Sequence, residues 1–515
     1  MTMVSHKTID AITAMLNWVK KTKSYEKTRV AVVKGYPGVG KTKTMIELAK
    51  SYPAIWIFAL PRRTLRDAVF ERAKPSHAKK ILGVPEVVQY RKLRVAKLLM
   101  KDELDDCPLH EHIKNLRQIV LQRFDLPLSR DIVARLPSTC LVWIYCMHIC
   151  RKRREGQCPF LRELWTCIRL AAKSEHIMFV TTYVGAAILS MLLKEAVNSL
   201  VVVIDEFDDL ATAMESYSIH ETTVRAMVAS GDEILERIGE KIASTWIYDH
   251  ERRIYIAPIL PFHAHAVIAL SATPIEVVLT ANPSVEIFTR TEIPIDKPVK
   301  DMLLYTPLWR SSTAAEKEIS VVVNIIRDIM SITSKAGLSH GIVVPNKRVA
   351  QAVVEELWKH NIYAYYGDDI KRAYRSRNVI IVPNDRLYRG VSINKDVVIA
   401  LYQGWDWDTI KFNLHPQLKK ALGWRDPLIK RSMYMINMAS NVQALFRFIR
   451  IHTMPHLVII LDKRMMDALR FFMKDYVENH CIVRDYPHPA DFLTHLEHNI
   501  LEFINYRLRY LSQQP

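Results

Sequence analysis

Short apolar runs of strand length recur along the chain, and most lead through a polar turn into residues with a helical period. In the first half these runs cover residues 30–33, 54–60, 177–182, 200–204 and 266–270. In the second half they cover residues 340–344, 378–383, 396–401 and 457–461. Apolar runs that alternate with helical segments are typical of parallel sheets covered by helices. The pattern therefore predicts an α/β protein with two parallel-sheet domains.

Helical spacing of apolar residues and a cluster of prolines give the expected domain plan. Pro294, Pro298 and Pro307 indicate a linker over 293–307, because proline punctuates regular structure. We expect one domain over residues 1–300 and another over 301–515 with a mostly helical end. Two mainly helical insertions should interrupt the first domain, at about 75–175 and 211–262. Helices are predicted over residues 4–22, 42–50, 319–332, 346–359 and 439–451.

The first apolar run leads directly into a glycine-rich segment that ends in Lys41-Thr42. The pattern is G-x-x-x-x-G-K-T with every fixed position filled. Glycines let successive backbone N–H groups face phosphate oxygens, the lysine adds a positive charge, and the threonine hydroxyl can bind Mg²⁺. The alternative is a strand–helix turn without a ligand. We predict a nucleoside triphosphate site formed by Gly35, Gly38, Val39, Gly40, Lys41, Thr42 and Lys43.

A second apolar run ends in adjacent carboxylates, Asp205-Glu206, followed by Phe207-Asp208. This is the Walker B arrangement, in which Asp205 would hold Mg²⁺ and Glu206 would orient and deprotonate the attacking water. The alternative is an acidic helix start that only complements the helix dipole. A further run ends in Ser271-Ala272-Thr273, whose hydroxyls could sense the γ-phosphate.

Charge and composition narrow the class of partner. Hydrophobic residues make up 49% of the chain and charged residues 24%, which is typical of a globular protein. The net charge of +18 favours a polyanion such as nucleic acid, although a basic, well-solvated surface is the alternative. No uncharged run reaches the ~20 residues of a membrane span, and no signal peptide is evident. We expect a cytoplasmic protein without a membrane partner.

Six of the seven cysteines lie in the first expected insertion: Cys107, Cys140, Cys146, Cys150, Cys158 and Cys167. Cysteines gathered in one insertion of an intracellular protein indicate metal or iron–sulfur ligation. Zinc fits less well, because only one pair has finger-like spacing. Inert buried thiols are the remaining alternative.

Two basic segments could contact phosphates. Arg62, Arg63 and Thr64 follow the second apolar run, where a translocating ATPase would hold a nucleic-acid backbone. Gln443, Arg447 and Arg450 share one face of the expected helix over 439–451. Arginines in the second domain could act as fingers that stabilise the transferring phosphoryl group. An ordinary loop and a solvated basic helix are the respective alternatives.

Taken in order, these blocks resemble the superfamily 2 DNA helicases of the XPD/DinG type. The blocks are GYPGVGKT, ALPRRT, VVVIDEFD, LSATP, GIVVPN, YRGVSI, QALFRFIR and LDKR. The resemblance implies two RecA-like domains, ATP and Mg²⁺ as ligands, 5′→3′ movement on single-stranded DNA, and a [4Fe–4S] cluster. By the family pattern, Cys107, Cys146, Cys150 and Cys158 would hold that cluster, with Cys140 as a substitute, and Gly390 would lie at the nucleotide.

The chain departs from that family at several positions. DEAH is DEFD here, so Asp208 occupies the place that couples hydrolysis to strand binding. Phe446 stands before Arg447 where the family has glycine, and Ser392 replaces an acidic residue. These changes indicate a divergent member of the family, for which a virus or a mobile element is one source to consider.

We therefore predict an ATP-dependent helicase or translocase that acts on single-stranded and forked duplex DNA. One alternative is a translocase or RNA remodeller that does not unwind duplexes. The other is a nucleic-acid-binding protein whose nucleotide site does not hydrolyse, against which the intact GKT and Asp205-Glu206 argue.

Overall fold

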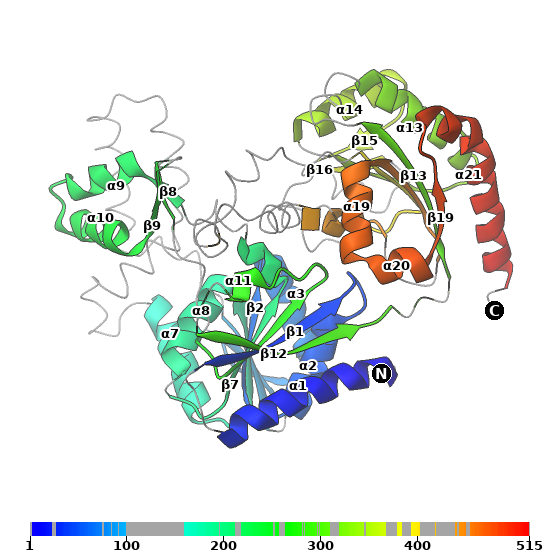
Figure 1. Cartoon of the computed structure of the whole chain (residues 1–515). Coiled ribbons are helices and arrows are strands. Elements are labelled where there is room, and N and C mark those ends of the chain that lie inside the picture. Colours follow the sequence, from blue (N-terminus) through cyan, green and yellow to red (C-terminus); the bar gives the residue numbers. More distant parts are fainter. Residues whose placement is uncertain are drawn as a thin grey trace. The chain divides into compact units, whose positions relative to one another are not determined.

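The structure is a computed structural model of the chain (Figure 1). It describes residues 3–22, 27–74, 77–83, 85–90, 92–98, 159–194, 196–211, 218–250, 253–256, 263–280, 282, 284–295, 297, 299–309, 319–344, 347–366, 379–383, 393–401, 418, 438–439, 442–449 and 454–513. The chain divides into two compact units. Met1–Lys34 and Lys41–Glu292 form most of the first, and Ile293–Lys411 and Pro427–Pro515 form most of the second.

The first unit is built on a nine-stranded sheet with the order β12-β1-β11-β7-β2-β6-β5-β4-β3. Neighbouring strands from β1 to β5 run parallel, whereas β5, β4 and β3 are antiparallel. The strands are β1 (Thr28–Gly35), β2 (Ile55–Leu60), β3 (Lys79–Leu82), β4 (Glu86–Tyr90), β5 (Leu93–Lys97), β6 (Ile177–Thr182), β7 (Leu200–Asp205), β11 (Ala266–Ser271) and β12 (Val285–Ile293).

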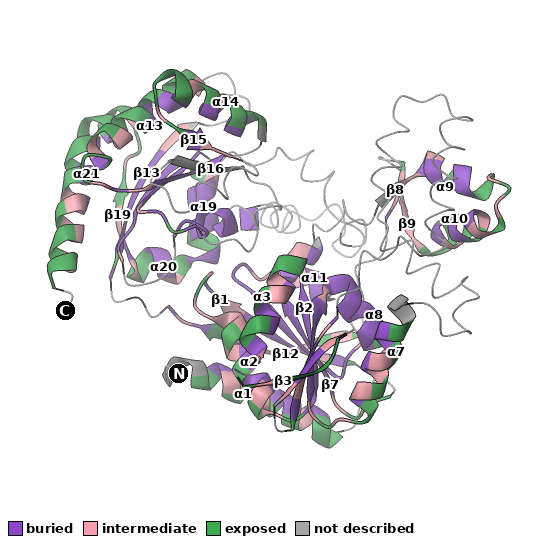
Figure 2. Ribbon diagram, turned by 180° about the vertical axis from the view of Figure 1, so that it is seen from behind, coloured by how far each residue is buried: buried purple, intermediate pink, exposed green. Residues whose placement is uncertain are grey.

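Helices cover this sheet because its central strands are apolar on both faces. Every residue of β2, β7 and β11 is buried, which Figure 2 shows as purple strands. Helices α1, α3 and α8 pack against the strands. The helical elements of this unit outside its small subdomain are α1 (Met3–Thr22), α2 (Lys41–Ser51), α3 (Arg63–Ala73), α7 (Pro159–Ala172), α8 (Tyr183–Leu193), the 3₁₀ helix η4 (Phe207–Ala211) and α11 (Val277–Thr280).

A small α/β subdomain occupies the second expected insertion, so the expectation that this insertion is mainly helical was wrong. It contains the antiparallel sheet β8-β10-β9 and a pair of packed helices. Gly239 is needed where these helices meet, because a Cβ there would lie 2.8 Å from Val228 Cγ2. The elements are β8 (Ser218–His220), α9 (Glu221–Val228), α10 (Glu233–Thr245), β9 (Ile247–Asp249) and β10 (Ile254–Ile256).

The second unit has a seven-stranded sheet with the order β15-β16-β14-β17-β18-β13-β19, and all of its neighbouring strands are parallel. Helices α13, α14 and α21 bury one apolar stripe each against its core. The elements are β13 (Asp301–Trp309), α13 (Ile319–Thr333), β14 (His340–Val344), α14 (Lys347–Lys359), β15 (Ala364–Tyr365), β16 (Val379–Pro383), β17 (Val397–Ala400), β18 (Leu457–Asp462), α19 (Lys463–Phe472), α20 (Lys474–Asn479), β19 (Cys481–Asp485) and α21 (Pro489–Ser512).

The fold class is as predicted: an α/β chain with two parallel-dominated sheets. The expected linker was too long, because β12 ends at Ile293 and β13 begins at Asp301. Pro307 lies inside β13, where the register with β18 shifts between Tyr305 and Trp309, so the missing N–H is tolerated. Only the few residues between these strands remain as a connection.

Two further expectations differ from the structure. The stretch over 75–175 was expected to be mainly helical, yet its described beginning forms β3, β4 and β5, which extend the sheet. The helix expected over 439–451 is helical only to Leu445 in its described part, and the backbone then turns. No helix of the described residues combines the length and the apolar character that crossing a bilayer requires.

Candidate nucleotide site

The predicted phosphate loop, the two carboxylates and the serine–threonine segment follow three strands that are neighbours in the first sheet. The order is β1-β11-β7, and all three run parallel. Their carboxyl ends therefore meet at one edge, where open α/β sheets bind ligands. Register pairs Lys34 with Ser271 and Leu270 with Asp205 at this edge. Residues up to 240 positions apart in the sequence are brought together in this way.

Two glycines give the loop after β1 its shape. Gly38 has φ +93° and Gly40 has φ +90°, in the region that favours glycine. Open space surrounds the position of a Cβ on Gly38, so backbone strain and not steric contact requires glycine there. The helix α2 begins at Lys41 directly after the loop. The backbone thus has the local features of an anion-binding loop at a helix N-terminus.

The two Mg²⁺ candidates lie within hydrogen-bond distance of each other. Thr42 Oγ1 donates to Asp205 Oδ2 over 2.9 Å. Mg²⁺ prefers hydroxyl and carboxylate oxygens of this kind, so the pair fits a hydrated divalent cation. Burial lowers the pKa of Lys41, although the nearby charges of Asp205, Glu206 and Asp208 act in the opposite direction. One lysine among three carboxylates leaves a negative site that a cation would balance.

Asp205 is strongly perturbed by this environment. Burial and the charge of Glu206 raise its pKa to about 6, against the opposing effects of Lys41 and the Thr42 hydrogen bond. Only 8% of Asp205 is exposed. An aspartate with this pKa lacks a sufficient counter-charge, and a bound metal ion would supply one.

Glu206 has a strained backbone. Its φ is +53°, which is unusual for a residue that is not glycine. The Tyr183 hydroxyl lies within hydrogen-bond distance of the carbonyl oxygens of both Asp205 and Glu206, and these contacts hold the turn. Within the described part of the chain, Glu206 Oε2 is buried and has no hydrogen-bond partner. A buried carboxylate oxygen without a partner in this part of the structure, held by a strained backbone, is suited to binding a water molecule.

Asp208 accepts hydrogen bonds from the last residue of β11 and from a residue just after that strand. Its Oδ1 accepts from Ser271 Oγ over 2.6 Å, and its Oδ2 accepts from Thr273 Oγ1 over 3.2 Å. Ser271 Oγ also accepts from the backbone N–H of Thr273. All three residues are buried. A displacement of the Asp205–Asp208 turn would therefore be passed directly to the end of β11.

Arg62, Arg63 and Thr64 lie where β2 gives way to α3. Arg62 is the N-cap residue of α3, and Arg63 and Thr64 are exposed in its first turn. These positions place basic and hydroxyl side chains at the N-terminus of an eleven-residue helix, which suits a phosphate group. Their predicted contact with nucleic acid stays a prediction.

Gln443 and Arg447 belong to the second unit and are 6% and 7% exposed. The premise that they share one helix face is wrong, because Arg447 lies in the turn after the helical residues. The carbonyl of Arg447 accepts from the N–H of Ile393, and that of Phe448 accepts from the N–H of Lys395. This pairing of distant segments cannot be read from local periodicity. Participation of Gln443 and Arg447 in nucleotide hydrolysis stays a prediction.

Several predicted site residues lie outside the described residues: Gly390, Arg450, Cys107, Cys140, Cys146, Cys150 and Cys158. Cys167 is described, and it is a free thiol buried in α7 whose pKa is raised by burial. In the described parts of the chain, no three histidine, cysteine, aspartate or glutamate side chains are grouped so that they could hold one metal ion by themselves. The iron–sulfur and zinc alternatives therefore stay predictions.

The site has one component that motif analysis did not identify. Tyr183 fixes the turn that carries both catalytic candidates, but it follows β6 and precedes Asp205 by 22 positions. Nothing in its local sequence indicates a tyrosine that binds two carbonyl groups. Ser271 and Thr273 were singled out, whereas their shared partner Asp208 follows only from the strand order.

Comparison with known proteins supports the fold. No protein-family model matches the sequence, and a search of curated proteins found no match. Among solved structures, one described as an XPD helicase matches with a TM-score of 0.51 and 12% identity, covering 93% of this chain and 99% of that one. Xpd4 from S. tokodaii matches with a TM-score of 0.52 and 10% identity, covering 92% and 98%. At this identity the likeness shows the fold alone: two RecA-like domains, as in those two structures.

Proposed function

We propose that this protein is an ATP-dependent translocase of superfamily 2 that moves on single-stranded nucleic acid and unwinds forked DNA, with XPD/DinG-like 5′→3′ polarity. The observation that carries the proposal is the Asp205–Glu206 turn. It combines a Thr42–Asp205 hydrogen bond with a strained Glu206 whose Oε2 is buried without a partner among the described residues. A purely structural acidic turn would need neither the strain nor the unused oxygen.

Each predicted site residue has a defined task in this proposal. The loop around Gly38 and Gly40 and the ammonium of Lys41 bind the phosphates, and Thr42 and Asp205 would hold Mg²⁺, which neutralises charge on the phosphate oxygens. Glu206 orients the attacking water and accepts its proton. Arg447 and Arg450 of the second unit would supply the positive charge that stabilises the transferring phosphoryl group, and the neutral amide of Gln443 would act with them as a hydrogen-bonding group.

Nucleic acid would be held through its backbone. Arg62, Arg63 and Thr64 at the start of α3 suit phosphate oxygens, and the net charge of +18 favours a polyanion. Contacts of this kind carry no base information, so binding should be tolerant of sequence and sensitive to salt. The Asp208–Ser271–Thr273 contacts would transmit the state of the nucleotide to the rest of the first unit.

ATP hydrolysis with and without single-stranded DNA or RNA tests the enzyme assignment. We expect stimulated turnover in the wild type and background turnover in Glu206→Gln, which keeps the size of the side chain and removes the base. Equal, background turnover in both proteins would favour the non-hydrolysing alternative. Arg63→Ala should weaken strand binding without affecting the nucleotide site.

Strand displacement from duplexes with a 5′ or a 3′ tail tests the mechanical assignment. Unwinding of the 5′-tailed DNA duplex alone is expected. Hydrolysis without unwinding of any fork would favour a translocase, and displacement from RNA forks would favour an RNA remodeller.

A [4Fe–4S] cluster in the cysteine-rich insertion remains part of the proposal through the family resemblance. Cys107, Cys146, Cys150 and Cys158 would hold it, with Cys140 as the substitute. Its chemistry would be structural, bracing an element that separates the strands.

A further inference from the structure

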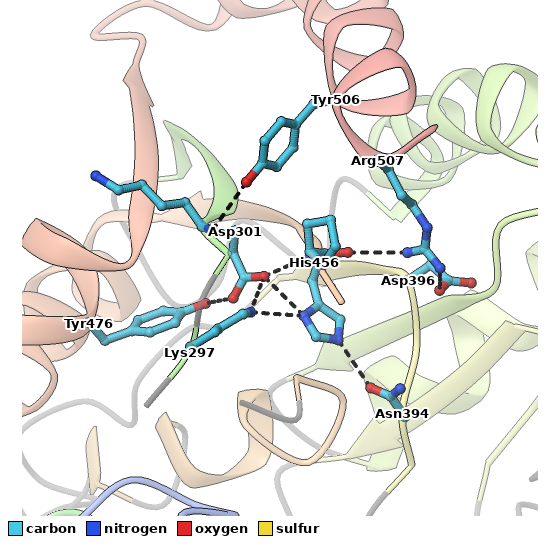
Figure 3. A network of polar contacts seen from close by, with 10 residues as sticks. Lys297, Asp301, Asn394, Asp396, His456, Tyr476, Tyr506 and Arg507 are labelled. Carbon is cyan, nitrogen blue, oxygen red and sulfur yellow. Dashed lines mark hydrogen bonds and ion pairs between the residues drawn. The ribbon is translucent and has the colours of Figure 1, made fainter. Parts of the chain in front are cut away.

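The second unit contains a buried polar cluster around Asp301, at the start of β13 (Figure 3). Asp301 is fully buried and accepts hydrogen bonds on both carboxylate oxygens. The Tyr476 hydroxyl donates to Oδ2 over 2.6 Å, and the His456 backbone N–H donates to Oδ1 over 2.7 Å. The Lys297 ammonium, whose side chain is also fully buried, forms an ion pair with Oδ1. Both carboxylate oxygens of Asp301 are thus occupied by donors from the protein, so we interpret the cluster as a structural anchor and not as a ligand site.

His456 connects this anchor to a segment that precedes β17. Its Nδ1 lies 3.0 Å from Asp301 Oδ1, and its Nε2 lies 3.1 Å from Asn394 Oδ1. The imidazole is almost fully buried, whereas Asn394 is exposed. Figure 3 shows the histidine between the two partners. One ring therefore fixes the position of Asn394 relative to the start of β13.

The residues on either side of Asn394 hold the segment that contains Arg447. The N–H of Ile393 donates to the Arg447 carbonyl over 2.9 Å, and the N–H of Lys395 donates to the Phe448 carbonyl over 3.0 Å. The Phe448 ring lies against β14, so close that a Cβ on Gly341 would be 2.5 Å from Phe448 Cδ1. The backbone around Arg447 is thus fixed on one side by Gly341 and on the other by residues 393–395.

We propose that His456 and Asn394 are positioning residues for Arg447, with Asp301 as the anchor through which they act. The proposal rests on the function proposed above, in which Arg447 stabilises charge on the transferring phosphoryl group. A guanidinium performs that task only when its backbone is held in place, because small displacements of a catalytic group reduce the rate strongly. Asp301, Asn394, Arg447 and His456 all belong to the second unit.

The test uses the full-length protein and three variants. Asn394→Ala removes an exposed side chain and should leave the fold intact. His456→Asn places an amide nitrogen where Nδ1 contacts Asp301 but cannot reach Asn394. His456→Gln can extend as far as Nε2 and can retain the contact with Asn394. Asn324→Ala, an exposed asparagine on α13, is the matched control.

Two readouts separate positioning from a structural role. In Asn394→Ala and His456→Asn, amide hydrogen exchange of residues 393–395 should accelerate, because their bonds to residues 447 and 448 open more often. In the same two variants, kcat for nucleic-acid-stimulated ATP hydrolysis should fall about fivefold while KM for ATP stays unchanged. A loss of this size corresponds to one hydrogen bond. His456→Gln should stay near the wild type, and Arg447→Ala combined with Asn394→Ala should be no slower than Arg447→Ala alone.

Exchange and kcat in Asn394→Ala equal to those of Asn324→Ala would overturn the proposal. An additive loss in the double variant would do the same, because Asn394 would then act independently of Arg447. If the wild type does not hydrolyse ATP and exchange at 393–395 still accelerates in Asn394→Ala, the positioning stands and the proposed function fails.

Discussion

Replacement of Asp205 by asparagine should stabilise the ligand-free protein at neutral pH while abolishing its activity. Asparagine keeps the size of the side chain and an oxygen that can accept from Thr42 Oγ1. It removes a charge that burial and Glu206 disfavour. The sequence alone gives no reason to expect stabilisation, because Asp205 is part of a motif that activity requires.

The size of the effect follows from the pKa of Asp205. The folded-state pKa of about 6 compares with 3.8 for the free side chain. Each unit of difference corresponds to 1.36 kcal/mol, so ionised Asp205 destabilises the fold by about 3 kcal/mol at most. Near pH 4 the carboxyl is protonated in the folded state and only about half ionised in the unfolded state, so most of the difference from asparagine disappears. The penalty develops as the pH rises from 4 to 6 and is complete above 6.

The quantity to measure is the difference in stability between the wild type and Asp205→Asn, because other titrating groups change the pH dependence of stability in the opposite direction. Burial lowers the pKa of His265 and of His340 to about 4. Both histidines are neutral in the fold, so their contribution to stability is fully present above pH 6.5 and is lost as the pH falls toward 4. The stability of each protein should therefore decrease on acidification, even though protonation of Asp205 alone would stabilise the wild type at acidic pH.

Native-state hydrogen exchange of β7 measures the local free energy of opening in wild type and Asp205→Asn. We expect stronger protection in the variant at pH 7.5 and similar protection near pH 4, after correction for the intrinsic exchange rate. Addition of Mg²⁺ at pH 7.5 should narrow the gap by stabilising the wild type alone. Asp10→Asn on the exposed side of α1 is the control. Weaker protection in Asp205→Asn at pH 7.5, or a gap that does not depend on pH, would refute the reasoning.

Three further outcomes are expected. Ser271→Ala removes the hydroxyl that donates to the buried Oδ1 of Asp208 and should lower the free energy of unfolding by about 1–3 kcal/mol, which urea unfolding measures. The double variant Ser271→Ala with Asp208→Asn should lose less stability than the sum of the two single changes. Gly341→Ala should displace Phe448 and reduce kcat for ATP more than it changes KM, and an unchanged kcat would contradict the contact. Protein purified without oxygen should be brown with about four irons per chain, whereas a colourless preparation containing zinc would exclude the cluster.

The parts of the fold that were predictable are those fixed by local chemistry. Glycines with positive φ, apolar runs of strand length and polar strand ends identify the loop after β1 and the ends of β7 and β11. These features depend on residues adjacent in the sequence. The sequence therefore predicted the two sheets and the components of the candidate nucleotide site, and the strand order of the first sheet explains why these components meet.

The parts that were missed depend on contacts between distant residues. Proline in β13 is tolerated only because the register with β18 shifts near Pro307. The helical pattern over 439–451 is interrupted because carbonyls at Arg447 and Phe448 pair with the backbone near residue 394. Neither partner lies within a window that periodicity can examine. His456 likewise contacts Lys297 and Asp301, from which it is separated by 159 and 155 positions.

The buried aspartates Asp301 and Asp205 differ in how far neighbouring donors and charges compensate for burial of the carboxylate. Asp301 is saturated with donors, and although burial alone would raise its pKa, hydrogen bonds from His456 and the charge of Lys297 outweigh that effect and lower it. Asp205 is also buried, yet its pKa is raised because burial and the charge of Glu206 outweigh Lys41 and the Thr42 hydrogen bond. Burial also raises the pKa of Asp462 to about 6, although that residue caps α19, so a raised pKa alone does not identify a ligand site. At Asp205 the Thr42 hydroxyl lies within hydrogen-bond distance and offers a second oxygen that Mg²⁺ could bind. The contrast argues that the Asp205 site is built for a cation and the Asp301 site is complete in itself.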